Sequence, residues 1–193
     1  MRRHRMLNVA VIIGSTREGR FGPVVADWFI AQAKAHGGTQ IDVIDLAEVD
    51  LPMVLPPSVP PAPQTSDLAR RLHTADAFVF VTPEYNRSFP ASVKNVIDWH
   101  YSEWQAKPVG FVSYGSMSGG QHAIQALRGV FAELHAVTIR DTISFANPWN
   151  QFDDHGRHLD PAGPERAATT LMNQLLWWGR ALKNARAEHP YGS

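Results

Sequence analysis

The sequence contains no cysteine, which excludes disulfide bonds, thiolate-ligated metal sites and cysteine nucleophiles. It also lacks an excess of either charge, because 18 lysine and arginine side chains balance 18 aspartates and glutamates. A nucleic-acid partner normally selects a basic surface, so this balance argues against nucleic-acid binding. A protein without cysteine is compatible with a reducing compartment such as the cytoplasm, where we expect it to reside.

Long hydrophobic runs are missing as well. The basic residues 1–6 lead into only about seven apolar residues before Gly14, and no small-residue cleavage site follows. Such a run is too short to cross a membrane. We therefore expect no membrane association, and the length of 193 residues predicts a single domain, 1–193.

Apolar runs and helical patterns alternate along the chain. Strands are predicted at residues 9–13, 40–45, 77–81, 109–113 and 138–144. Helices are predicted after Pro23, from Ser66 or Asp67 to Thr74, from Pro90 to about Trp99, after Gly120, and from about Pro164 to Ala187. Three of the strands are nearly continuous apolar runs, which is typical of parallel strands covered on both faces. The pattern predicts an α/β fold: a flavodoxin-like, doubly wound, five-stranded parallel sheet of order 2-1-3-4-5 with helices on both faces.

In such a sheet the ligand lies beyond the carboxyl ends of the strands, at the switch point between the first and third strands. Three loops rich in glycine, proline and polar residues follow strands of the predicted sheet: 14–22, 83–89 and 114–120. Topology is therefore expected to bring these three segments to one crevice.

The first loop carries the features of an anion site. Ser15 and Thr16 supply hydroxyls, Arg17 and Arg20 supply charge, and the helix that follows begins with unpaired N–H groups at the positive end of its dipole. The loop matches neither the Gly-x-Gly-x-x-Gly nor the triphosphate fingerprint, which favours a single phosphate over a pyrophosphate. Arg20 either contacts that phosphate or faces solvent, and we favour contact.

The other two loops are suited to a flat ligand. Pro83 and Pro90 fix the ends of the second loop and leave residues 84–88 as a stiff ridge. The glycines of the third loop, Gly115 to Gly120, allow a ligand to approach the backbone closely. Each loop alone is also compatible with an ordinary exposed turn, and only their joint placement predicts a site.

Two further segments have no firm assignment. The proline-rich stretch 46–64 is long for a compact domain, which indicates either a functional flap or an arm that reaches a second subunit. The cluster Asp153-Asp154-His155-Gly156-Arg157-His158 contains metal-binding residue types, but a polar turn is the favoured interpretation.

Three motifs resemble one protein family. Gly14-Ser-Thr-Arg17, Pro83-Glu-Tyr-Asn86 and Lys94-Asn95-x-Ile-Asp98 are similar to segments of the NADPH-dependent FMN reductases, and the resemblance covers about residues 7–144. It implies that the first loop holds the phosphate of FMN, that Tyr85 lies against the isoalloxazine ring, and that the third loop closes the other side. The implied cofactor-binding residues are Ser15, Arg17, Arg20, Phe21, Gly22, Pro83, Glu84, Tyr85, Asn86, Tyr114, Gly115 and Ser116.

The same resemblance implies an oxidoreductase that passes hydride from NADPH or NADH through flavin N5 to a flavin, quinone, azo compound or similar small molecule. No catalytic side chain and no metal are then expected, because the flavin carries the chemistry. A homodimer or homotetramer is implied as well. Two alternatives stay open: a flavodoxin-type FMN electron carrier, although carriers are usually strongly acidic and this chain is neutral, and a flavin-free binding module.

Overall fold

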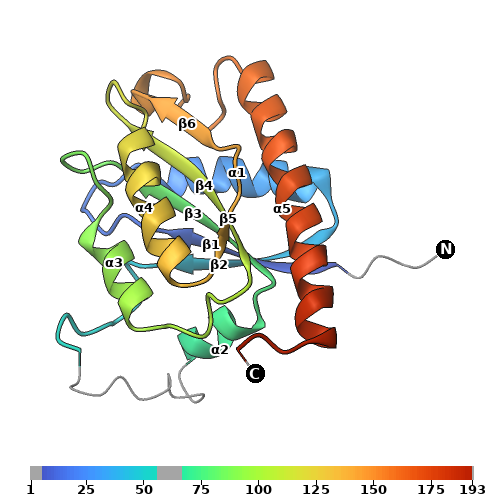
Figure 1. The fold of residues 1–193 in the computed structure, drawn as a ribbon. Helices are drawn as coiled ribbons and strands as arrows, with labels where there is room; N and C mark the ends of the chain where they lie inside the picture. The colour runs from blue at the N-terminus through green and yellow to red at the C-terminus, as the bar shows by residue number, and fades with distance from the viewer. Residues whose placement is uncertain (1–5, 56–66, 193) are drawn as a thin grey trace.

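A parallel sheet forms the centre of the molecule in the computed structural model, which describes residues 6–55 and 67–192 (Figure 1). Its main strands are β1 (Leu7–Ile13), β2 (Thr39–Asp45), β3 (Ala77–Pro83) and β4 (Pro108–Gly115). With the short β5 (Val137–Thr138) at one edge, the strand order β2-β1-β3-β4-β5 confirms the predicted doubly wound topology. The carboxyl ends of β1, β3 and β4 consequently lie side by side in register, with Ile13 beside Val81 and Pro83 beside Tyr114.

Helices cover both faces of the sheet and separate two hydrophobic cores. Alternate residues of β1 point to opposite faces, as the period of a strand requires. Val9 and Val11 pack with α1 (Gly22–His36) and α5 (Ala162–Glu188), whereas Ala10 and Ile12 pack with α2 (Asp67–Thr74), α3 (Ala91–Asp98) and α4 (Gln121–Glu133). None of the helices within the described ranges is long and apolar enough to span a bilayer.

The last predicted strand, 138–144, is interrupted, so the single strand expected there is wrong. β5 (Val137–Thr138) pairs with the start of β4, and β6 (Ile143–Ala146) pairs with its end. Arg128 of α4 fills the interruption by donating hydrogen bonds of 2.8 Å to the carbonyls of Ile139 and Arg140. A side chain thus replaces the missing ladder bonds, and a short 3₁₀ helix, η1 (Pro148–Asn150), follows β6.

Only the first part of the proline-rich segment 46–64 can be placed, because residues 56–64 lie outside the described residues. That part lies against α3. Asn95 Nδ2 donates to the Leu51 carbonyl at 3.1 Å, and Trp99 Nε1 donates to the Pro52 carbonyl at 2.8 Å. The expectation of a flap or an intersubunit arm stays a prediction.

A buried lysine caps the carboxyl end of α2. The Lys107 ammonium, at the start of β4, donates hydrogen bonds of 2.9 Å to the carbonyls of Leu72 and His73, which the helix itself leaves unpaired. Burial, together with the nearby Arg186 guanidinium, lowers the pKa of Lys107 to about 7, although Asp76 and Glu103 oppose that shift. The charged form is therefore less favourable in the folded protein than in the unfolded chain.

This shift predicts a pH-dependent stability. An unfolded lysine keeps its proton up to about pH 10.4, so folding releases a proton between about pH 7 and 10 and the free energy of unfolding rises with pH there. Relative to a Lys107→Met variant, we expect the wild type to gain stability with a slope of up to about 1.4 kcal/mol per pH unit. Urea titrations at pH 7, 8, 9 and 10 measure this difference. If the free energy of unfolding changed equally with pH in the two proteins, the lowered pKa of Lys107 would be contradicted.

Candidate functional site

The three predicted loops converge on one cleft of about 630 Å³ at the carboxyl ends of β1, β3 and β4. Its lining residues are Ser15, Arg17, Glu18, Gly19, Arg20, Phe21, Pro83, Glu84, Tyr85, Tyr114, Gly115, Ser116 and Trp149. Every predicted site residue except Gly22 and Asn86 is among them. The structure therefore brings together three loops that are about thirty to a hundred residues apart in the sequence.

The first wall of the cleft is the turn between β1 and α1. No acceptor within residues 6–55 and 67–192 takes the backbone N–H groups of Thr16, Arg17, Gly19 or Gly22, and the first turn of α1 contains no acidic residue. The positive end of the helix is therefore uncompensated and faces the cleft, which favours an anion. The buried Ser15 hydroxyl adds a polar group and lies 2.9 Å from the Tyr85 hydroxyl.

Two arginines of this turn have different partners. Arg17 lies over the Tyr85 ring, 5.2 Å from its centroid, and pairs with no carboxylate in the described part of the chain. Arg20 instead binds both carboxylate oxygens of Asp45, at 2.5 and 2.6 Å, and the Ser15 carbonyl at 2.7 Å. The hydrogen bonds that Arg20 donates to Asp45 raise the pKa of Arg20 despite its partial burial. Arg20 thus ties the turn to the end of β2, and its contact with a phosphate stays a prediction.

Gly22 supports the cleft without lining it. A Cβ atom at this position would lie 2.9 Å from the Tyr114 hydroxyl and 3.1 Å from a methyl group of Ile13, so only glycine lets the helix start so close to β4. The Tyr114 hydroxyl is buried and has no hydrogen-bond partner among the described residues. Burial raises the pKa of Tyr114 well above its ordinary value, so the phenol is neutral and can donate.

The second wall contains a tight turn. Tyr85 and Ser88 exchange backbone hydrogen bonds of 2.8 and 3.0 Å, and the two residues between them, Asn86 and Arg87, have φ angles of +50° and +65°. Positive φ at both central positions is the requirement of a type I′ turn. Asn86 belongs to the turn rather than to the cleft lining, whereas Tyr85 stays in the wall. The predicted stiffness of this ridge has its physical basis in the turn.

The Glu84 carboxylate joins the second wall to the third. It accepts hydrogen bonds from the Ser118 hydroxyl at 2.8 Å and from the His122 backbone N–H at 3.1 Å, and it lies 2.9 Å from His122 Nδ1. Burial disfavours the charged form of Glu84, but these hydrogen bonds outweigh it and lower the pKa of the carboxyl group. Glu84 therefore caps the start of α4 and fixes the distance between the loops.

The third wall needs glycine for a steric reason. Gly120 has a φ of +90°, and a Cβ there would lie 2.6 Å from the Cβ of Ser113 and 2.9 Å from the backbone nitrogen of Tyr114. The turn consequently lies flat against the end of β4. Ser113 holds it there with a hydrogen bond of 2.7 Å to the Gly119 carbonyl.

One lining residue that lies outside the three predicted loops was missed by the sequence reasoning. Trp149, on η1, is 55% exposed at the cleft. Asn147 places this segment by donating its N–H to the Gly115 carbonyl at 2.7 Å. The signal that could have found Trp149 is its position just after the last strand, because the carboxyl end of that strand lies at the same edge of the sheet.

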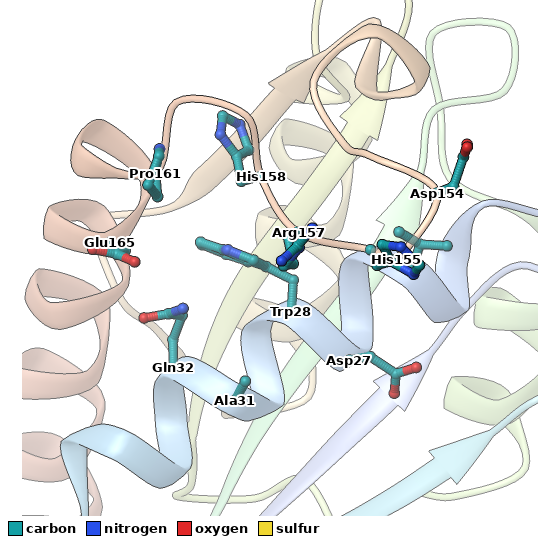
Figure 2. Close-up of a pocket in the computed structure, with 12 residues that line it drawn as sticks. Asp27, Trp28, Ala31, Gln32, Asp154, His155, Arg157, His158, Pro161 and Glu165 are labelled. Atoms are coloured by element: carbon teal, nitrogen blue, oxygen red, sulfur yellow. The ribbon is translucent and has the colours of Figure 1, made fainter.

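A second groove, of about 740 Å³, lies between α1, residues 154–158 and the start of α5 (Figure 2). The cluster 153–158 forms a polar turn here, in which Asp153 Oδ1 accepts the N–H groups of His155 and Arg157 at 2.9 and 2.8 Å. In the described residues no group of three or more potential ligands could hold a metal ion. Figure 2 shows acidic and basic side chains around the groove, so its charge selects no ligand.

A doubly wound parallel sheet of order β2-β1-β3-β4-β5 with helices on both faces defines the flavodoxin-like class. Solved structures agree on the fold. FerB, a flavoenzyme NAD(P)H:(acceptor) oxidoreductase from Paracoccus denitrificans, has a TM-score of 0.72 at 22% identity, covering 91% of this chain and 98% of that one. A flavodoxin from the domain Archaea has a TM-score of 0.59 at 11% identity, covering 91% and 99%.

The chain belongs to the NADPH-dependent FMN reductase family, whose sequence model matches residues 7–150. An NAD(P)H-dependent FMN reductase from Schizosaccharomyces pombe is 36% identical over 124 residues, which is 61% of this chain and 62% of that protein. The match thus spans about three fifths of that relative. A probable NADPH:quinone oxidoreductase from Oryza sativa is 30% identical over 179 residues, covering 88% of this chain and 87% of that protein.

The contacts of Glu84 with Ser118 and His122, which we call the Glu84 clamp, generate a prediction about stability. Glu84→Gln replaces the charged carboxylate, which contacts three donors, by a neutral amide. We expect the free energy of unfolding to fall by about 1–3 kcal/mol at pH 7. Because the folded pKa is lowered, this contribution is present above the unfolded pKa of about 4.3 and is lost as pH falls through the folded value. Denaturant titrations at pH 7 and then stepwise downward from pH 4 should show a large difference from wild type that shrinks as the pH passes below the folded value.

Glu18→Gln is the matched control, because Glu18 lines the same cleft but is exposed and makes no side-chain hydrogen bond within the described ranges. It should leave stability almost unchanged. An equal loss of unfolding free energy in the two variants would contradict the stabilising role of the Glu84 clamp.

Proposed function

We propose that this protein is an NAD(P)H-dependent, FMN-binding oxidoreductase that transfers electrons from NADPH or NADH to a small flat acceptor such as a flavin, quinone or azo compound. The observation that carries the proposal is the convergence of an uncompensated helix start and two stiff loops on one cleft at the switch point of the sheet. Family membership supports it, as do relatives whose names describe FMN reductases and NADPH:quinone oxidoreductases.

The residues of the cleft fit FMN. The volume of the cleft, about 630 Å³, is typical of cofactor pockets. Arg17, the Ser15 side of the turn and the free N–H groups at the start of α1 would hold the phosphate. The Tyr114 hydroxyl, which has no partner in the described chain, is a donor that a polar ligand could satisfy. Tyr85, Pro83, Gly115 and Ser116 would lie along the flat ring.

Bound FMN supplies hydride acceptance at its N5 atom. The protein's own contribution is position and electrostatics. The turn at Tyr85–Ser88 and the Glu84 clamp hold the two loops fixed, so backbone donors need little reorganisation when charge develops on a ligand between them. No side chain needs to act as a nucleophile, which agrees with a chain that has no cysteine.

We also propose that the protein works as a homodimer or homotetramer in the cytoplasm, with a small-molecule acceptor and no nucleic-acid or membrane partner. The lack of cysteine supports the compartment. Large exposed aromatic side chains, above all Trp177 on α5, support self-association.

The purified protein should be yellow, with flavin absorption that bleaches under anaerobic conditions when NADPH or NADH alone is added. Readmitting a quinone should restore the absorption. A yellow protein that the nicotinamides do not bleach would indicate the electron carrier instead, and a colourless protein that takes up no FMN would indicate the flavin-free module. Absorption spectroscopy with and without each nucleotide distinguishes the three.

Arg17→Ala tests the phosphate site. Loss of a charged hydrogen bond of about 1.5–3 kcal/mol should weaken FMN binding about 10- to 100-fold. Riboflavin lacks the phosphate, so its affinity should not change. Flavin fluorescence quenching measures both constants. Arg70→Ala is the control, because Arg70 pairs with Asp67 on α2, away from the cleft. Unchanged FMN affinity in the Arg17 variant would contradict the proposed contact between Arg17 and the phosphate.

A further inference from the structure

The long helix α5 carries a mostly exposed outer stripe, and one of its members, Asn173, lies with its Oδ1 2.9 Å from His36 Nε2 of α1. The inner side of α5 is buried against the sheet through Leu171, Leu175 and Gly179. Figure 1 shows α5 running along the right-hand side of the molecule. We define the outer stripe as Arg166, Thr170, Asn173, Trp177, Ala181, Asn184 and Glu188. At about 100° per residue, all of them lie within about 40° of Trp177 around the helix axis.

Trp177 is the conspicuous member of this stripe. Its side chain is 63% exposed at the middle of α5, and its ring centroid lies 5.0 Å from that of Trp178, which is itself partly exposed. The other stripe residues are polar or small. A single large aromatic with polar and small neighbours on both sides along a helix is suited to a helix–helix contact centred on that residue.

The stripe is complementary to itself about Trp177. A twofold axis places each residue before its centre opposite the residue equally far after it on the partner. Arg166 and Glu188 each lie eleven residues from Trp177, and Thr170 and Asn184 each lie seven residues from it. An antiparallel pair of α5 helices therefore sets each Arg166 against Glu188 of the partner subunit, twice. The small Ala181 faces Asn173 and leaves room beside the indole.

The two terminal charges of the stripe do not pair with each other within one chain. Arg166 and Glu188 are about 33 Å apart along the helix at 1.5 Å per residue, so they cannot meet. Neither has an ion-pair partner within residues 6–55 and 67–192, whereas Lys183 and Arg186 of the same helix face Asp76 at 2.7 and 4.0 Å. A cation at the start and an anion at the end of a helix also oppose its dipole. Pairing across two copies would compensate both charges at once.

We propose that the outer stripe of α5 is a self-docking surface, on which a second copy of this chain binds antiparallel with Trp177 at the twofold axis. The inference rests on the proposed self-association and not on flavin binding. It identifies the surface and the register of the contact.

Charge reversal with rescue tests this register. Arg166→Glu and Glu188→Arg should each halve the molar mass measured by size-exclusion light scattering, and Trp177→Ser should do the same. The double variant Arg166→Glu/Glu188→Arg restores complementarity across the axis and should recover the wild-type mass. Each single reversal also agrees with the helix dipole, so a loss of mass does not arise from a weakened fold.

Glu133→Arg is the matched control, because Glu133 is an exposed acid at the end of α4, on the opposite face of the sheet. It should keep the wild-type mass. The proposal is overturned if the wild type is monomeric, if the single reversals keep its mass, or if the double variant fails to recover it. Flavin content and NADPH turnover of the same samples report separately on the proposed function.

Discussion

The carboxylate of Glu84 is the contact on which the geometry of the cleft depends. Parallel pairing brings the ends of β3 and β4 together, but it does not fix the loops that leave them. Glu84 does so by accepting hydrogen bonds from Ser118 and from the start of α4. The Glu84 side chain is 11% exposed, and hydrogen bonds to a charged acceptor are stronger than those to a neutral one. The two walls therefore act as one rigid piece.

The turn between β1 and α1 is organised by an ion pair. Arg20 reaches across to Asp45 at the end of β2 and also binds the Ser15 carbonyl. Its positive charge is consequently neutralised by the protein, and its role is to hold the turn in shape. Arg17 and the free N–H groups of the turn are left to attract an anion. Positioning and attraction are thus divided between two arginines three residues apart.

The sequence was sufficient to predict the architecture and most of the cleft, because buried parallel strands are apolar runs and their loops must meet at one edge. It was not sufficient where a distant side chain determines the outcome. The split between β5 and β6 depends on Arg128, from another helix, and the partner of Arg20 lies 25 residues away. Trp149 was missed because the motifs end before it. Periodicity carries no information about which of several polar side chains turns toward a given loop.

The locked turn between β1 and α1 has a kinetic consequence. When the loops of a site already have their final shape, no rearrangement precedes the encounter, and the association rate constant approaches that of a simple collision with an open cleft. The residence time of the nucleotide is then set by how many contacts must break before it departs. Differences in affinity among related nucleotides should therefore reside almost entirely in their rates of departure.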